Sequence, residues 1–139
     1  MTNEDLVRSR LADAHRFLDY ADQALKAGVF HHVVQFAQRA VELAIKALLA
    51  HVGEDAPHTH NLAKRVSNLP LVRALPPDQQ SRFYESHRAL ADQRLTATYG
   101  TDTGVPPEAV YDRAKAGEAL DQGQFVVNTV ETLISRKVE

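Results

Sequence analysis

The feature that most constrains the fold is a nearly continuous apolar pattern over residues 29–52, VFHHVVQFAQRAVELAIKALLAHV. On a helix with roughly 100° per residue, its apolar side chains cover well over half of the circumference. A helix this apolar is buried on two sides, so the rest of the chain is predicted to pack around it. The remaining arc is a narrow polar stripe, flanked by His32 and Arg39 and formed by His31, Gln35, Gln38, Glu42 and Lys46.

A long amphipathic helix is predicted before this central one. Thr2 or Asn3 is a suitable N-cap, because short polar side chains accept hydrogen bonds from free backbone N–H groups, and acidic residues follow. Apolar residues then repeat at intervals of three and four until Gly28, which suits the left-handed conformation at a helix C-terminus. The connection to the central helix is so short that the two helices are expected to be antiparallel neighbours.

Proline and glycine divide the remainder of the chain. Gly53 ends the central helix, and residues 54–76 are predicted to form a surface connection with one short helix. A third long helix is predicted over residues 77–98 and a fourth over residues 106–136, where small residues allow close approach to a neighbour. No segment shows useful strand-like alternation. The sequence therefore predicts a single all-α domain over residues 1–139, an antiparallel, up-and-down bundle of four long helices plus one short helix.

Composition limits the classes of function. The absence of cysteine excludes disulfides, thiolate catalysis and cysteine-ligated metals, and fits a reducing, cytoplasmic compartment. The N-terminus lacks the apolar core of a signal peptide, and the apolar segments are too interrupted by charge to span a bilayer, so no membrane association is expected. A formal net charge of −2 lacks the basic excess of a protein that coats nucleic acid. Any contact with nucleotide or RNA is therefore predicted to be local and to depend on a few cations.

The clearest chemical anomaly lies on the predicted third helix. One face of it combines an imidazole and a cation with an otherwise apolar seam: Phe83, His87, Leu90, Arg94 and Ala97. Arg94 and Tyr99 also border the following loop, where a phosphate can approach from solvent. Arginine suits that task because its planar guanidinium donates two hydrogen bonds to phosphate oxygens and keeps its charge. The structural alternative is an ion pair of Arg94 with an acid such as Glu42 or Asp92.

The segment His58-Thr59-His60-Asn61 is a second candidate site. Together with His51 it has enough imidazoles for a metal site, but the spacing of histidines and carboxylates is not typical of metal ligands, so no metal and no cofactor are predicted. Capping of a short helix by Thr59 or Asn61 explains the segment better. His60 remains a candidate proton donor, because imidazoles titrate near neutral pH.

In the order of its parts, the chain resembles the HEPN domains, named for higher eukaryotic and prokaryotic nucleotide binding. The parts are an alanine-rich first helix, the central FHHVVQFAQRAVELAIKALLA helix, the PHTHNL loop, an R-x4-Y-G segment and a closing amphipathic helix. The resemblance covers nearly the whole chain and implies an all-α bundle that commonly dimerises. HEPN members bind nucleotides, act as RNase toxins, or pair with small nucleotidyltransferases.

The resemblance also implies a role for Arg94. RNase members carry an arginine, four to six residues and then a histidine near the end of the third long helix; here Arg94 matches the arginine, and Tyr99 stands in the histidine position. In metal-free RNA cleavage the histidine moves protons for attack by the 2′-hydroxyl, while the arginine stabilises the charge that develops on the phosphorane. Tyrosine, with an ordinary pKa of about 10, is a poor base at neutral pH. The motif therefore favours binding over catalysis.

The sequence leaves three functional hypotheses open. The leading one is a nucleotide- or RNA-binding module, one component of a toxin–antitoxin-like pair with a small nucleotidyltransferase. Its phosphate-binding candidates are Arg94, Lys46 and Arg39, and its other site candidates are Tyr99, His60 and His87. The alternative is a metal-independent endoribonuclease toxin that acts as a dimer, with His60 or His87 supplying the proton transfer. The third is a dimerisation scaffold without ligand.

A homodimer is predicted on the additional ground of surplus apolar surface. Four apolar side chains of the third and fourth helices lie outside the main seams of the predicted bundle: Tyr84, Leu95, Val127 and Ile134. Exposed apolar area of this kind is typical of surfaces that bind another protein.

Overall fold

The computed structural model describes residues 2–54 and 62–136, and within them it contains eight helices and no strand. Four helices are long: α1 (Asn3–Ala27), α2 (Phe30–His51), α5 (Pro77–Asp92) and α8 (Arg113–Ser135). Four are short: α3 (Leu62–Ser67), α4 (Pro70–Arg73), α6 (Arg94–Tyr99) and α7 (Pro107–Val110). The predicted all-α fold with four long helices is confirmed, although it has more short helices than the single one predicted.

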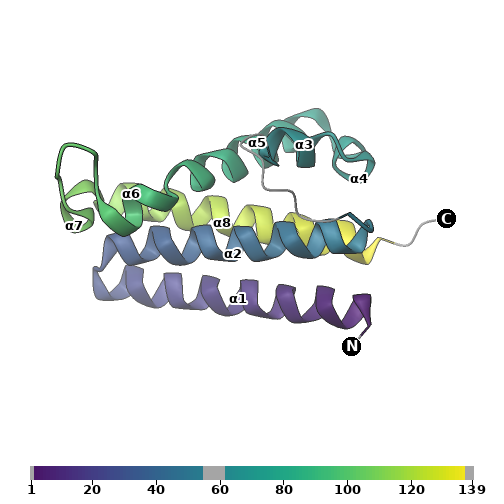
Figure 1. The fold of residues 1–139 in the computed structure, drawn as a ribbon, viewed down its shortest axis with the longest axis horizontal. Coiled ribbons are helices and arrows are strands. Elements are labelled where there is room, and N and C mark those ends of the chain that lie inside the picture. Colours follow the sequence, from purple (N-terminus) through teal and green to yellow (C-terminus); the bar gives the residue numbers. More distant parts are fainter. Residues whose placement is uncertain (1, 55–61, 137–139) are drawn as a thin grey trace.

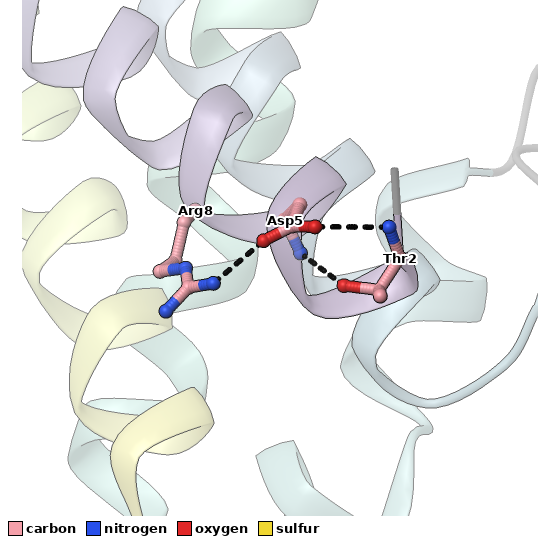
Figure 2. Close-up of polar contacts among 3 residues, drawn as sticks. All are labelled: Thr2, Asp5 and Arg8. Carbon is pink, nitrogen blue, oxygen red and sulfur yellow. Dashed lines mark hydrogen bonds and ion pairs between the residues drawn. The ribbon is translucent and has the colours of Figure 1, made fainter.

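Helix α1 begins with a capping box that identifies Thr2 as the N-cap (Figure 2). The backbone N–H of Asp5 donates to Thr2 Oγ1 at 3.1 Å, and the N–H of Thr2 donates to Asp5 Oδ2 at 3.0 Å. Arg8 donates to the other oxygen of the same carboxylate at 2.7 Å. The backbone hydrogen bond from Thr2, followed by the bond from Arg8, lowers the pKa of Asp5 to about 2. At the other end, Gly28 adopts the left-handed conformation with φ 76°, as predicted.

Helix α2 is the centre of the fold, as its apolar pattern predicts. It lies antiparallel to α1, and α8 packs against both of them. In Figure 1, α8 lies behind α2, and α5 lies above α2. Its core positions are almost completely excluded from solvent, among them Val33, Ala37, Ala44 and Leu48. The small residues of α8 allow the predicted close approach, because a Cβ at Gly123 would lie 3.3 Å from Ala37 Cβ.

The third long helix is shorter than predicted. The sequence predicts one helix over residues 77–98, but α5 ends at Asp92 and α6 begins at Arg94. At the break, the N–H of Gln93 donates to the carbonyl of Leu90, only three residues back, at 3.1 Å. The Gln93 side chain accepts a hydrogen bond from the hydroxyl of Tyr111 at 2.6 Å. This break invalidates the prediction that Arg94 shares one buried face with the α5 seam.

The fourth long helix also begins later than predicted. Residues 107–110 form the separate turn of α7, after which Tyr111 is buried in an extended conformation with φ −109° and ψ 141°. Asp112 then caps α8 by accepting a hydrogen bond from the N–H of Lys115 at 2.8 Å. Burial of Tyr111 and this cap together explain why one helix over residues 106–136 does not form. Helix α8 runs without interruption past Gly123.

The surplus of apolar surface behind the homodimer prediction is smaller than the sequence indicates. Leu95 is 66% exposed, but Val127 is completely buried inside the bundle, and Tyr84 and Ile134 are half-buried. Only one of the four predicted positions is therefore a large exposed apolar side chain. Every helix in the described ranges is too short or too polar to cross a lipid bilayer.

Candidate functional site

Helix α6 carries Arg94 and Tyr99, the two residues of the R-x4-Y segment. The helix is fixed on the N-terminal half of α2, where Gln35 Nε2 donates to the carbonyl oxygen of Ala97 at 2.7 Å. Ala97 itself is completely buried. One side of this short helix is therefore attached to the central helix, and the rest of it is accessible.

Arg94 is exposed, and neither of the acids considered as its partner binds it. Glu42 pairs with Lys46 at 3.3 Å and with Arg39 at 3.9 Å, while Asp92 pairs with Arg88 at 3.7 Å. Among the described residues, the guanidinium of Arg94 makes no ion pair. The structural alternative, an ion pair of Arg94 with Glu42 or Asp92, is therefore wrong.

Arg94 and Tyr99 do not point in the same direction. Five residues along an α-helix turn through about 500°, so the two side chains diverge by about 140° and start roughly 7.5 Å apart along the axis. Tyr99 is 76% exposed at the last position of α6. The two side chains consequently cannot converge on one phosphate within one chain.

A tight loop follows α6 and fixes its end. The N–H of Thr101 donates to the carbonyl of Val105 at 2.9 Å, and the N–H of Val105 donates to Thr101 Oγ1 at 3.1 Å. Gly100, with φ 85° and ψ −163°, lies against this closure. A Cβ at Gly100 would lie 2.0 Å from the carbonyl oxygen of Val105, so only glycine fits there.

The other two phosphate candidates lie on α2. Lys46 and Arg39 come together at Glu42, whose carboxylate neutralises part of their charge. The guanidinium of Arg39 also lies 6.0 Å from the ring centroid of Phe17, next to a group of aromatic rings on α1 and α2. No ion pair or hydrogen bond in the described part of the chain joins this cluster to Arg94.

His87 lies in the core and is 5% exposed, between the buried Phe83 and Leu90 of the same helix face. Burial lowers its pKa to about 4, because charging the imidazole there would cost its hydration. Its Nδ1 has no hydrogen-bond partner among the described residues. His87 is thus held neutral at physiological pH and faces away from solvent.

His60, the remaining catalytic candidate, lies outside the described residues, as do His58 and the other residues of the PHTHNL loop before Leu62. Within residues 2–54 and 62–136, no three histidine, aspartate or glutamate side chains are grouped closely enough to hold a metal ion.

The chain matches the HEPN domain over residues 7–133, which is nearly its whole length. The chain belongs to the HEPN domain family. Its fold is similar to that of TT1696 from Thermus thermophilus, at 27% sequence identity and a TM-score of 0.76, with 91% of this chain and 97% of that chain covered. ST0689, an archaeal HEPN homologue, has the same fold at 23% identity and a TM-score of 0.72, with 93% and 98% covered. No curated protein matches significantly.

In this HEPN domain, the sequence pattern does not reveal which residues hold α6 in place. The pattern places Gln35 only in the polar stripe and Tyr111 inside a continuous helix. In the structure, Gln35 binds the backbone of α6, and Tyr111 binds Gln93 at the break before α6. The pattern assigns Leu95 only to a dimer contact. The spacing of four between Leu95 and Tyr99 indicates that both lie on one face of α6, because residues four apart share a helix face.

Proposed function

We propose that this HEPN domain binds nucleotides or RNA through a phosphate group, with Arg94 as the principal contact. The observation that supports this proposal is the exposure of the Arg94 guanidinium, which has no ion-pair partner among the described residues. A free guanidinium binds a phosphate through two charge-assisted hydrogen bonds. Lys46 and Arg39 are secondary candidates, since Glu42 already competes for their charge.

The proposal favours binding over RNA cleavage. An endoribonuclease of this family type needs a proton-transfer group near the arginine. His87 is a poor choice, because its side chain is buried and its pKa is lowered to about 4. Tyr99 diverges from Arg94 around α6. A metal-independent nuclease therefore remains the second candidate, and it depends on His60 or on a histidine from a second chain.

The proposal includes a homodimer and a protein partner, a small nucleotidyltransferase that would form a toxin–antitoxin-like pair with this chain. Membership of the HEPN family supports both assignments. We expect sedimentation at micromolar concentration to give twice the chain mass of 15.4 kDa. A monomer at that concentration would contradict the dimer and would remove the version of the nuclease hypothesis that needs a histidine from a second chain.

The main test of the proposed function is Arg94→Ala. We expect it to lower the affinity for a short RNA by about ten- to a hundredfold, because a charge-assisted contact contributes about 1.5 to 3 kcal/mol. The melting temperature should stay the same, since Arg94 is exposed. Fluorescence anisotropy with a labelled RNA and a thermal melt measure both quantities.

A matched control is Arg65→Ala, which removes the same charge from α3, a helix at the other end of the molecule from α6 (Figure 1). Arg65 is also an exposed arginine, and its partner is Glu54 at 3.4 Å. If Arg94→Ala melts normally and still binds RNA and nucleotide like the wild type, the proposed function is wrong and the scaffold hypothesis gains.

A further inference from the structure

Three aromatic rings of α1 and α2 form a cluster at the surface of this helix pair. The ring centroid of Phe17 lies 5.7 Å from that of Tyr20 and 6.1 Å from that of Phe36, and the centroids of Tyr20 and Phe36 are 5.7 Å apart. Tyr20 is 40% exposed, and the two phenylalanines are half-buried. Leu43, two turns beyond Phe36 along the same side of α2, is also half-buried. We call these four side chains the aromatic face.

The aromatic face lies on the side of α1 and α2 that points away from α8. Glu131 of α8 binds His15, and Phe17 lies about 160° from His15 around α1. On α2, Ala37 packs against α8, and Leu43 lies about 120° from Ala37. In the described ranges, α2 and α8 are the only helices that pack extensively on α1. Helix α8 therefore covers one side of the pair and leaves the aromatic face accessible.

Basic side chains surround the aromatic face. The guanidinium of Arg39 lies 6.0 Å from the ring centroid of Phe17, and Arg16 lies one turn before Tyr20 on α1. The charged groups here are four cations and two acids that pair with three of them: Arg10, Arg16, Arg39, Lys46, Asp13 and Glu42. The face thus carries an excess of positive charge, although the whole chain has a formal net charge of −2.

This charge argues against a second copy of the chain as the symmetric occupant of the aromatic face. In a twofold dimer each surface patch meets the same patch of the other subunit. The excess cations of the two copies would then oppose one another, and such like-charge contacts disfavour association. The homodimer of the proposed function is therefore expected to use another surface.

The arrangement of the charges favours a protein over a nucleic acid. Asp13 and Glu42 are interspersed among the cations, so they would repel a continuous row of phosphates. Phe17 contacts two other rings, and the guanidinium of Arg39 lies over it, so Phe17 does not offer an open ring to a stacked base. A protein segment can instead place separate acidic side chains at the cations and apolar side chains at the rings.

From this arrangement we infer that the aromatic face binds an amphipathic helix of another protein, with apolar side chains on the rings and acidic side chains at the surrounding cations. A helix suits this surface because Phe36 and Leu43 form an apolar strip along α2 that extends over roughly 10 Å, and amphipathic helices dock their apolar stripes on such surfaces. The inference goes beyond the proposed function, since it adds a second binding surface that does not include Arg94.

The test uses two labelled helical peptides of equal length, which share a stripe of leucines and carry either glutamate or lysine beside it. We expect the wild type to bind the glutamate peptide about tenfold or more tightly than the lysine peptide, because the face has an excess of positive charge. Tyr20→Ala should weaken binding of the glutamate peptide about tenfold, since exposed aromatic side chains at the centre of an interface dominate its affinity. Fluorescence anisotropy measures both affinities.

Reversal of charge on either helix gives a sharper test. Arg16→Glu on α1 and Arg39→Glu on α2 should each lower the affinity for the glutamate peptide about tenfold and raise the affinity for the lysine peptide. Arg65→Glu on α3 is the matched control, because it reverses an exposed arginine that pairs with Glu54 away from this face. A thermal melt of each variant shows whether it is folded, and either of the two arginine variants is sufficient for the test.

The outcomes separate this inference from the proposed function. Binding of neither peptide by the wild type, or equal affinity for both, overturns the inference, as does an equal loss in Arg65→Glu. If Arg39→Glu weakens binding of RNA but not of the glutamate peptide, the face is a nucleic-acid surface and the inference is wrong. Arg94→Ala should bind the glutamate peptide like the wild type. If that variant also keeps its full affinity for RNA, the proposed function fails and the inference stands.

Discussion

Gly100→Ala is expected to lower the free energy of unfolding by about 3 kcal/mol or more. The backbone of Gly100, at φ 85° and ψ −163°, lies in a region that is essentially restricted to glycine, and forcing another residue into it costs about 1 to 3 kcal/mol. In addition, the new Cβ would lie 2.0 Å from the carbonyl oxygen of Val105, a backbone atom that cannot move without opening the loop. Chemical denaturation of both proteins measures the difference.

Gly104→Ala is the matched control, because Gly104 lies in the same loop but has open space at the position of a Cβ. Gly104 also has a positive φ, 90°, yet a Cβ there would have no atom of residues 2–54 or 62–136 within 4 Å. Its expected cost is therefore only the conformational one, about 1 to 2 kcal/mol. Equal losses in the two variants would mean that the contact between Gly100 and Val105 does not stabilise the loop.

The Gly100→Ala variant also links the loop to the proposed site. If Gly100→Ala opens the loop, the C-terminal end of α6 loses its support. We expect binding of RNA through Arg94 to fall even where the rest of the bundle remains folded. Helix α6 is thus positioned by two separate contacts, the bond from Gln35 to Ala97 and the closure of the loop at Gly100.

The features that the sequence predicted correctly depend on local chemistry. The cap at Thr2 needs only Asp5, three residues away, and the end of α1 needs only the backbone freedom of Gly28. The central position of α2 follows from its apolar pattern over 22 residues. Such features can be derived because the interacting groups are close together in the chain.

The features that the sequence did not predict depend on distant residues. Gln93 is neither proline nor glycine, and the break beside it involves Tyr111, whose hydroxyl arrives from 18 residues later in the chain. Without that contact, the seam pattern continues to Arg94 and places it on the buried face. The exposure of Arg94, on which the proposed function depends, accompanies a helix break that periodicity does not show.

His87 shows how far a sequence anomaly can be interpreted. The pattern placed an imidazole in the apolar seam correctly. The structure adds that the side chain is 5% exposed and that Nδ1 has no hydrogen-bond partner in the described part of the chain. To act in catalysis, the His87 side chain would have to reach a phosphate, and its burial prevents that. Its burial in the core instead makes the stability of the fold dependent on pH.

We expect His87→Leu to remove most of the loss of stability that the wild type shows between pH 6.5 and pH 4. The pKa of His87 falls from 6.5 in the unfolded chain to about 4 in the fold, because burial disfavours the charged imidazole. Between these values the unfolded chain binds a proton that the folded chain does not, so stability falls as the pH falls. At about 1.4 kcal/mol per pH unit, the share of His87 reaches about 3 kcal/mol at pH 4.

The measurement is the free energy of unfolding by urea at several pH values from 7 down to 4. Leucine has a volume close to that of histidine and needs no hydrogen bond, so at pH 7 the variant should stay within about 1 kcal/mol of the wild type. His51→Gln, which changes an exposed histidine at the end of α2, is the control variant. If His87→Leu loses stability in acid as steeply as the wild type does, His87 is accessible to protons in the folded state. That result would make it a candidate for proton transfer again and would strengthen the nuclease hypothesis at the expense of binding alone.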